Sequence, residues 1–221
     1  MIICLEGPDG CGKTSIALAV AKRLGAEVIT FPNDDAFTGP TIRSYLRKRW
    51  EVWEQPTGTP NQMRVSTEIG ALAFQALQIA NRMELMPRLA SASLQGKSDL
   101  VLARYWQSAW VYGQLDGLPT AWLEQVHESM IQPDFNILLD LDAEQCMKRR
   151  AARDGALPPE RYEGKLDFTK KVVELYRQLW NAKRAESNYA QPTPLWLVVD
   201  ASKPFEQVVD NAMHWISQCH G

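Results

Sequence analysis

Residues 7–14 constrain the fold more than any other segment of the chain. Their sequence, GPDGCGKT, satisfies the pattern G-x-x-x-x-G-K-[ST] at every fixed position. Residues 1–6 before them have the apolar composition of a buried strand, and residues 15–24 after them have the apolar face of a helix. A turn between a strand and a helix N-terminus directs backbone N–H groups and the positive end of the helix dipole at one point. The segment is therefore predicted to be a phosphate-binding loop.

The side chains of this loop suit a nucleoside triphosphate. The glycines let the backbone wrap around phosphates, Lys13 can reach the β- and γ-phosphate oxygens, and the Thr14 hydroxyl can hold Mg²⁺. We therefore predict Mg²⁺ as the cofactor and Thr14 as its ligand, and the alternative is a glycine-rich turn without a ligand. The residues predicted to bind the triphosphate are Gly10, Cys11, Gly12, Lys13, Thr14 and Ser15.

Composition favours a single compact domain. A length of 221 residues is enough for one α/β domain and short for two, so we predict one domain over residues 1–221. The formal net charge of −2 gives no electrostatic reason to expect a nucleic acid partner. We expect no leader and no membrane span, because no apolar run approaches ~20 residues. The cysteines lack metal-ligand spacing, so we expect free thiols and a cytoplasmic location.

Strand and helix patterns alternate along the chain. Apolar strands separated by helices indicate a parallel sheet covered on both faces. The predicted fold class is therefore α/β, a three-layer α/β/α sandwich around a five-stranded parallel sheet. The predicted strands are residues 1–6, 27–31, 99–103, 134–141 and 195–199. The predicted helices are residues 15–24, 41–53, 64–94, 121–130, a segment beginning at 143, 166–187 and 204–218, with a loop at 153–159.

Arginines near the ends of strands and helices narrow the chemistry. Arg104 directly follows the strand at 99–103, and ligands of doubly wound sheets bind at the carboxyl ends of strands, so Arg104 is predicted to face the phosphate loop. Arg82 lies within a predicted helix, where a solvated helix face is the alternative. A solvated surface also explains an arginine cluster around the loop, but phosphoryl transfer requires cations around the transferring group. That cluster comprises Arg149, Arg150, Arg153 and Arg161.

The order and spacing of these segments resemble the thymidylate kinase family over nearly all of the chain. The resemblance implies a P-loop NTPase fold with a lid at about residues 149–163. It also implies Mg²⁺-dependent transfer of the ATP γ-phosphate to a deoxynucleoside monophosphate, with dTMP converted to dTDP for dTTP synthesis. The family is commonly homodimeric, and residues 69–89 are a candidate interface that core packing explains equally well. The segments that carry the resemblance are the phosphate loop with Asp9, Phe31-Pro32, Ala80-Asn81-Arg82 with Glu84, Arg104-Tyr105 followed by Ser108 and Tyr112, Pro133-Asp134, and residues 139–142, 160–163 and 199–203.

On the donor side, the resemblance implies that Lys13 and the loop amides hold the ATP phosphates. A catalytic arginine of this family belongs either to the phosphate loop or to the lid, and the loop here has none. The resemblance therefore implies a lid arginine, with Arg153 as the first choice and Arg149 as the second. The residues expected to flank the adenine are Ala201, Ser202 and Lys203.

On the acceptor side, the resemblance implies that Arg104 holds the acceptor phosphate. Asp9 would reach toward the acceptor sugar and the waters of Mg²⁺, so both residues join Lys13 among the expected catalytic residues. Tyr112 would pack against the sugar 2′ position and favour deoxyribose, and Ser108 shares its helix face because the two stand four residues apart. The nucleoside pocket would be lined by Phe31, Pro32 and Arg82, with Arg82 bonded to the base edge.

The chain departs from the family pattern at three places. Ala103 stands where the family usually has an aspartate, directly before the arginine that follows the third strand. Residues 33–35 are Asn-Asp-Asp where an arginine is expected, and Arg43 is predicted to compensate. The aromatic residue that stacks on thymine falls at Gln78. These departures leave two alternatives open: another acceptor such as dUMP, dGMP or a modified base, and a catalytically impaired nucleotide-binding relative. A kinase of unphosphorylated nucleosides is a third alternative, which the excess of arginines over a candidate base disfavours.

Overall fold

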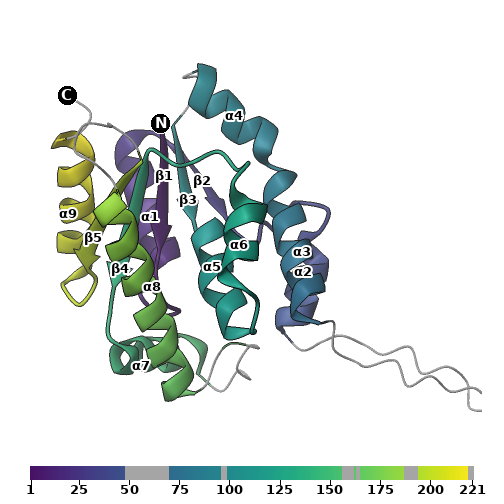
Figure 1. Ribbon diagram of the computed structural model, residues 1–221. Helices are drawn as coiled ribbons and strands as arrows, with labels where there is room; N and C mark the ends of the chain where they lie inside the picture. Colours follow the sequence, from purple (N-terminus) through teal and green to yellow (C-terminus); the bar gives the residue numbers. More distant parts are fainter. Residues whose placement is uncertain (48–69, 96–98, 156–161, 163–164, 187–193, 219–221) are drawn as a thin grey trace, which may run out of the picture.

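The computed structural model describes residues 1–47, 70–95, 99–155, 162, 165–186 and 194–218 (Figure 1). Within this part, the strands form one parallel sheet in the order β2-β3-β1-β4-β5. The central strand β1 pairs with β3 on one side and with β4 on the other. The predicted five-stranded parallel sheet is confirmed. The strands are β1 (Ile2–Glu6), β2 (Glu27–Thr30), β3 (Leu100–Ala103), β4 (Phe135–Asp140) and β5 (Leu195–Asp200).

Helices cover both faces of the sheet (Figure 1). On one face α1 (Lys13–Leu24) packs beside α9 (Phe205–Gln218), against Ile3 and Leu5 of β1. On the other face α5 (Trp106–Leu115) packs beside α8 (Leu166–Glu186), in the cluster that contains Ile2 and Cys4. Successive strand residues point to opposite faces, so every residue of β1 is buried. This arrangement confirms the predicted three-layer sandwich. The other described helices are α2 (Gly39–Leu46), α3 (Ala71–Met83), α4 (Met86–Gln95), α6 (Thr120–His127) and α7 (Ala143–Asp154).

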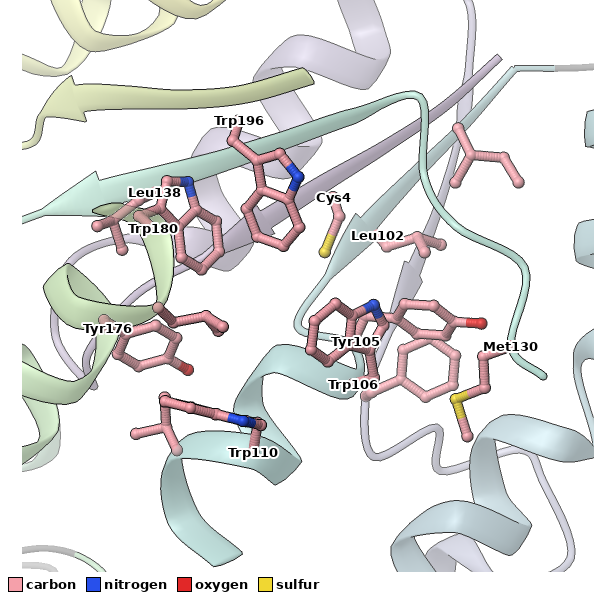
Figure 2. Packing of buried hydrophobic residues seen from close by; sticks show 14 of the residues in the cluster. Cys4, Leu102, Tyr105, Trp106, Trp110, Met130, Leu138, Tyr176, Trp180 and Trp196 are labelled. Atoms are coloured by element: carbon pink, nitrogen blue, oxygen red, sulfur yellow. The ribbon is translucent and has the colours of Figure 1, made fainter. Parts of the chain in front are cut away.

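A group of buried tryptophans holds α5 and α8 on the sheet (Figure 2). The rings of Trp180 in α8 and Trp196 in β5 meet edge to face, with centroids 4.9 Å apart. Trp106, the first residue of α5, meets the Trp196 ring edge to face at 6.0 Å. Each such aromatic pair adds about 0.5–1.5 kcal/mol beyond the area it buries. The packing therefore fixes the start of α5 beside the carboxyl end of β3.

The predicted helix at 64–94 is wrong as a single element, because the structure has two helices there. Helix α3 ends at Met83 and α4 begins at Met86, and residues 64–69 lie outside the described part. Pro87 stands in the first turn of α4. Proline has no N–H to donate to the carbonyl four residues earlier, and its ring would clash with that carbonyl in a continuous helix, so α3 cannot run on into α4. At the break, the Glu84 carboxylate accepts hydrogen bonds from the backbone N–H groups of Phe37 and Thr38, at 2.5 and 3.1 Å.

Other helices differ from their predicted bounds. The predicted helix at 41–53 begins earlier, at Gly39, and its part beyond residue 47 lies outside the described residues. Helix α5 is missing from the predicted helices, and only the spacing of Ser108 and Tyr112 implies it. The predicted loop at 153–159 begins later, because α7 continues through Asp154 and residues 156–159 are not described. Among the described helices, none combines the length and apolar character that crossing a membrane requires.

Candidate active site

The phosphate loop leaves the central strand β1 and enters α1 at the carboxyl edge of the sheet. Gly10 has a φ of 95°, in a region that L side chains rarely adopt. A Cβ atom at Gly10 would lie 2.3 Å from the carbonyl oxygen of Cys146, and one at Gly7 would lie 2.7 Å from that of Leu139. The loop therefore needs glycine both for its turn and for its close approach to β4 and α7.

Lys13 lies folded over this loop. Its Nζ donates hydrogen bonds to the carbonyl oxygens of Gly7 and Pro8, each at 2.8 Å. The same atom lies 3.7 Å from the Asp9 carboxylate, and only 6% of the residue is exposed. A lysine held in this way places a positive charge at the mouth of the loop, where the resemblance implies the donor phosphates.

A cavity of about 900 Å³ opens beside the loop. Thr14 and Ser15 line it from the N-terminus of α1, whereas the Cys11 side chain lies in the apolar core behind the loop. This volume is at the upper end of the range for small-molecule sites. The predicted site residues that line the cavity are Asp9, Gly10, Gly12, Lys13, Thr14, Ser15, Phe31, Pro32, Arg43, Gln78, Arg82, Arg104, Ser108, Tyr112, Arg149 and Arg153.

Arg104 and Asp9 both line this cavity and form an ion pair there. The Arg104 guanidinium pairs with the Asp9 carboxylate and donates to the Ser108 hydroxyl at 3.2 Å. The Tyr112 hydroxyl donates to the other Asp9 oxygen at 3.1 Å, and the Arg104 guanidinium lies 5.8 Å from the Tyr112 ring centroid. Burial alone would raise the pKa of Asp9, but the charges of Arg104 and Lys13 outweigh it and hold that pKa well below its usual range. Asp9 is therefore ionised at neutral pH.

A buried carboxylate that was not predicted from the sequence, Glu6, accepts hydrogen bonds from the residues that follow Arg104. Arg104 has a φ of 71°, a left-handed conformation that costs a non-glycine residue about 1–3 kcal/mol. The next residue, Tyr105, donates its backbone N–H to Glu6 at 2.6 Å, and Ser108 donates both its N–H and its hydroxyl, at 3.1 and 2.8 Å. The Tyr176 hydroxyl donates to Glu6 at 2.9 Å. These bonds hold the start of α5 and so offset the unfavourable backbone at Arg104. The only feature of the sequence that could have indicated this role of Glu6 is the position of an acidic residue at the end of an apolar strand.

Arg82 is buried, so the alternative of a solvated helix face is wrong. The residue is 2% exposed, and its Nη1 and Nη2 donate to the backbone carbonyls of Gln78 and Tyr105, at 2.7 and 2.9 Å. Burial lowers the pKa of its guanidinium to about 10, which leaves it charged at neutral pH. The guanidinium lies 5.9 Å from the centroid of the Phe31 ring, and both residues line the cavity. This position is compatible with a ligand contact by Arg82.

Comparison with known proteins identifies the family. The family model described as thymidylate kinase matches residues 5–212. The chain belongs to the thymidylate kinase family. It is therefore a nucleotide kinase with the P-loop NTPase fold.

Relatives and a solved structure agree with this assignment. A protein from Methanococcus maripaludis named "Probable thymidylate kinase" is 31% identical over 215 residues, which cover 97% of this chain and 94% of the relative. A Thermococcus onnurineus protein of the same name is 33% identical over 184 residues, which cover 81% of this chain and 83% of the relative. The structure of a Candida albicans thymidylate kinase, described as revealing the origin of broad substrate specificity, has a TM-score of 0.75 and 21% identity. It covers 100% of this chain and 93% of its own and shows the shared fold.

The segment after β2 is held against α3 in this member of the thymidylate kinase family. Asn81 accepts a hydrogen bond from the Asn33 N–H at 2.7 Å and donates to the Asn33 carbonyl at 3.0 Å. Arg43 of α2 lines the cavity, but its Nε pairs with Asp34 at 2.6 Å and its Nη2 donates to the Pro32 carbonyl at 3.3 Å. Its predicted role as a substitute for the family's arginine stays a prediction.

Arginines of α7 also line the cavity. Arg149 and Arg153 line it as predicted, and Arg153 donates to both oxygens of Asp154, at 2.5 and 2.8 Å. Arg150 also lines the cavity and is 7% exposed. Burial raises the pKa of Asp9, and the charge of Arg150 helps to lower it, after Arg104, Lys13 and the Tyr112 hydrogen bond. Arg150 belongs to the predicted arginine cluster but was not among the individually predicted site residues. Its spacing from Arg153, three residues along one helix, is the signal that could have indicated it.

The predicted lid at 149–163 is only partly described. Residues 149–154 are the last turns of α7 and so are helical, and residues 156–161, 163 and 164 lie outside the described part. Tyr162 lines the cavity, its hydroxyl donates to Asp116 at 2.5 Å, and its ring stacks on Phe168 with centroids 5.9 Å apart. The lid therefore stays a prediction, and α7 supplies its first residues.

The residues predicted to flank the adenine follow β5, at one edge of the sheet. Ala201 is buried against α1 and α9 in the core. The Ser202 N–H donates to Asp200 at 2.9 Å, and Lys203 lies 3.5 Å from the same carboxylate. None of the three is among the described residues that line the cavity. The structure does not bring these three residues together with the rest of the site. Their role beside the adenine stays a prediction.

The donor set at the phosphate loop fits Mg²⁺ delivered with a nucleotide. Among the described residues, no group of three or more His, Cys, Asp and Glu could hold a metal ion. The cavity instead offers the exposed Thr14 hydroxyl and two carboxylates, Asp9, which Arg104 already pairs, and Asp154, which Arg153 pairs. Mg²⁺ commonly takes only one or two protein oxygens and completes its shell with phosphates and waters.

Proposed function

We propose that this kinase transfers the γ-phosphate of ATP to a deoxynucleoside monophosphate, with dTMP as the principal acceptor and dTDP as the product. The observation that carries the proposal is that two cations meet at one carboxylate. Lys13 of the phosphate loop lies 3.7 Å from Asp9, and Arg104 at the end of β3 pairs with the same group. A donor and an acceptor phosphate on the two sides of Asp9 would each have a cation within reach. Such positioning supports direct in-line transfer without a covalent enzyme intermediate.

The charges of the cavity favour a monophosphate over an unphosphorylated nucleoside. A nucleoside hydroxyl needs a general base, and a base works best with a pKa near the working pH. Although burial opposes the shift, Arg104 and Lys13 hold the pKa of Asp9 below its usual range, and Asp154 pairs with Arg153. A monophosphate oxygen is already ionised and needs cations instead. The arginines along the cavity therefore suit a monophosphate.

Thr14 is the residue that would hold Mg²⁺ directly, and Asp9 would reach it through water. Bound with ATP, Mg²⁺ neutralises charge on the β- and γ-phosphate oxygens. Arg104 would hold the acceptor phosphate, and Arg153 or Arg149 would face the charge that develops during transfer. The homodimer stays a prediction, and on α3 the exposed apolar side chains of Leu72 and Met83 would suit an interface.

An assay of ADP release separates the possible functions. The enzyme is given ATP and Mg²⁺ with dTMP, thymidine, dUMP or dGMP under identical conditions. We expect the highest kcat/KM with dTMP. A preference for thymidine would contradict the proposal in favour of a nucleoside kinase, and a preference for dUMP or dGMP would change the base but keep the reaction. Absence of transfer to every acceptor would support an impaired relative.

Ala103 is the observation that favours the second candidate, a catalytically impaired nucleotide-binding relative. It lines the cavity at the end of β3, directly before Arg104, and is 2% exposed. A carboxylate at this position could orient Mg²⁺ waters and hold the Arg104 side chain, and a methyl group can do neither. The retained Lys13, Thr14 and Arg104 argue against complete loss of activity.

Ala103→Asp is expected to raise kcat by about tenfold to a hundredfold, the scale for an outer-shell partner of a metal site. Activity should saturate at lower Mg²⁺, with little change in ATP affinity. The measurement is a Mg²⁺ titration of kcat in both proteins, together with calorimetry of ADP binding with and without Mg²⁺. Ala103→Asn, which adds the same bulk without charge, is the matched control and should not reproduce the gain. Equal or lower activity in the Asp variant would refute this account of Ala103.

Tyr112→Ala is expected to improve ribonucleotide acceptors relative to deoxyribonucleotide acceptors, by about tenfold or more. The reason is steric, since a ring packed against C2′ leaves no space for a hydroxyl. The measurement is the ratio of kcat/KM for dUMP and UMP. Tyr112→Phe keeps the ring and loses only the hydrogen bond to Asp9, so its ratio should match that of the wild type. An unchanged ratio in the Ala variant would remove Tyr112 from the sugar pocket.

A further inference from the structure

Tyr176 of α8 is a buried tyrosine whose hydroxyl the proposed function does not use. The residue is 1% exposed, and its ring packs beside that of Trp180 on the same helix, with centroids 6.1 Å apart (Figure 2). Its hydroxyl lies 2.9 Å from two oxygens, Oε2 of Glu6 and Oγ of Ser108. Burial raises the pKa of this hydroxyl well above its usual range, so it remains a donor at neutral pH. Tyr176 therefore connects α8 to the end of β1 and to α5.

Ser108 joins this pair of residues to Arg104. The Ser108 hydroxyl donates to Glu6 Oε2 at 2.8 Å and accepts a hydrogen bond from Arg104 Nη1 at 3.2 Å. A serine or tyrosine hydroxyl has one proton. Two hydroxyl protons therefore serve the three contacts among Glu6, Ser108 and Tyr176. Every arrangement of these protons leaves a lone pair of Ser108 for Arg104, so the contacts fix the Ser108 side chain as an acceptor for the guanidinium.

The Glu6 carboxylate also holds the backbone that follows Arg104. Glu6 is 0% exposed and accepts the backbone N–H groups of Tyr105 and Ser108, at 2.6 and 3.1 Å. The left-handed backbone of Arg104, with a φ of 71°, persists only where its surroundings fix it. Removal of the Tyr176 hydroxyl takes one donor from Glu6 and lets the carboxylate turn. The backbone and the side chain of Arg104 then lose part of what fixes them.

Ala103 makes these contacts more important in this chain. Its methyl group offers the Arg104 side chain no hydrogen bond, so the guanidinium depends on Asp9 and Ser108. A phosphate bound to Arg104 competes with Asp9 for the N–H groups of the guanidinium. Ser108 is uncharged and is itself bonded to Glu6, so its contact stays in place with and without the phosphate. Ser108 therefore sets the orientation in which Arg104 meets a phosphate.

We propose that Tyr176 and Glu6 are positioning residues of the acceptor-phosphate site, which fix Arg104 through Ser108 and through the backbone N–H of Tyr105. This inference rests on the proposed function, because it requires Arg104 to bind the acceptor phosphate. Neither Glu6 nor Tyr176 is among the described residues that line the cavity. Their effect on a substrate therefore passes through Arg104, and it concerns the phosphate of the acceptor and not its nucleoside.

The test is the ratio of the Kd of thymidine to the Kd of dTMP, measured by calorimetry in the wild type and in Tyr176→Phe, which keeps the packed ring and removes only the hydroxyl. We expect the ratio to fall by about tenfold in the variant. The KM for dTMP should rise by a similar factor, and the KM for ATP should not change. The matched control is Tyr45→Phe, which removes the hydroxyl of another buried tyrosine, on α2, that is not among the residues lining the cavity. Its ratio should equal that of the wild type.

Ser108→Ala is the second variant, because it removes the link between Tyr176 and Arg104 and should also lower the ratio. The two substitutions together should lower it by less than the product of their single effects, since both break the same series of contacts. A merely structural role of Tyr176 would weaken the binding of thymidine and dTMP equally. An unchanged ratio in Tyr176→Phe, an equal fall in Tyr45→Phe, or single effects that multiply in full would overturn the proposal. Failure of the proposed function is a different result, namely no transfer to any monophosphate by the wild type.

Discussion

Arg153→Ala is expected to lower kcat by about 10³–10⁵-fold, the scale of arginine fingers in phosphoryl transfer, while the acceptor KM changes much less. Arg153 lines the cavity at the end of α7, and its side chain is 61% exposed in the pair with Asp154. Exposed ion pairs contribute little to stability, so this pair does not keep the guanidinium from a transferring phosphate. The phosphate loop carries no arginine. An arginine that stabilises the charge of the transferring phosphoryl group must therefore come from another element. Steady-state kinetics with ATP and dTMP measure the effect.

Two further variants make the assignment of Arg153 specific. Lys148→Ala removes an exposed cation from the same helix and should leave kcat close to the wild-type value. Arg149→Ala removes the second candidate, which also lines the cavity. If the Arg149 variant loses transfer and the Arg153 variant keeps it, the transition-state cation is Arg149.

Lys13→Ala is expected to lower kcat by on the order of 10²–10³-fold, the scale for removing one fixed electrostatic group from a transition state. The Lys13 ammonium is held over the loop by the carbonyls of Gly7 and Pro8, beside the predicted position of the β- and γ-phosphates. A bound phosphate would take over these contacts. The methyl group of alanine supplies no charge, and the loop glycines keep their turn without it. Phosphoryl transfer and far-UV circular dichroism of the variant are the two measurements.

The fold of the Lys13 variant should match that of the wild type, because the Lys13 ammonium bonds to carbonyls of its own loop and its side chain belongs to neither core cluster on the faces of the sheet. Lys22→Ala, an exposed lysine on α1, is the matched control and should transfer phosphate normally. Unchanged transfer in a folded Lys13→Ala protein would show that Lys13 does not act on the donor phosphates.

Local patterns in the sequence predicted the parts of the site that short segments build. The strand, the phosphate loop and α1 are adjacent in the chain, so motif spacing alone placed Lys13 and Thr14 correctly at the cavity. Arg104 followed from its position after β3, since the carboxyl ends of parallel strands share one edge. Pro87 was also a local signal, and the rule that proline interrupts a helix would have divided the predicted helix at 64–94.

Contacts between distant segments decided the rest. The donors to Glu6 come from Tyr105, Ser108 and Tyr176, which are 99, 102 and 170 residues away, and no spacing rule joins them. The local sequence left a solvated helix face open as the alternative for Arg82, and packing of α3 on α5 buries the residue. The sequence by itself determined the phosphate loop and the parallel sheet, because both depend on neighbours along the chain. The tertiary structure alone decided which polar groups are buried together, because burial depends on neighbours in space.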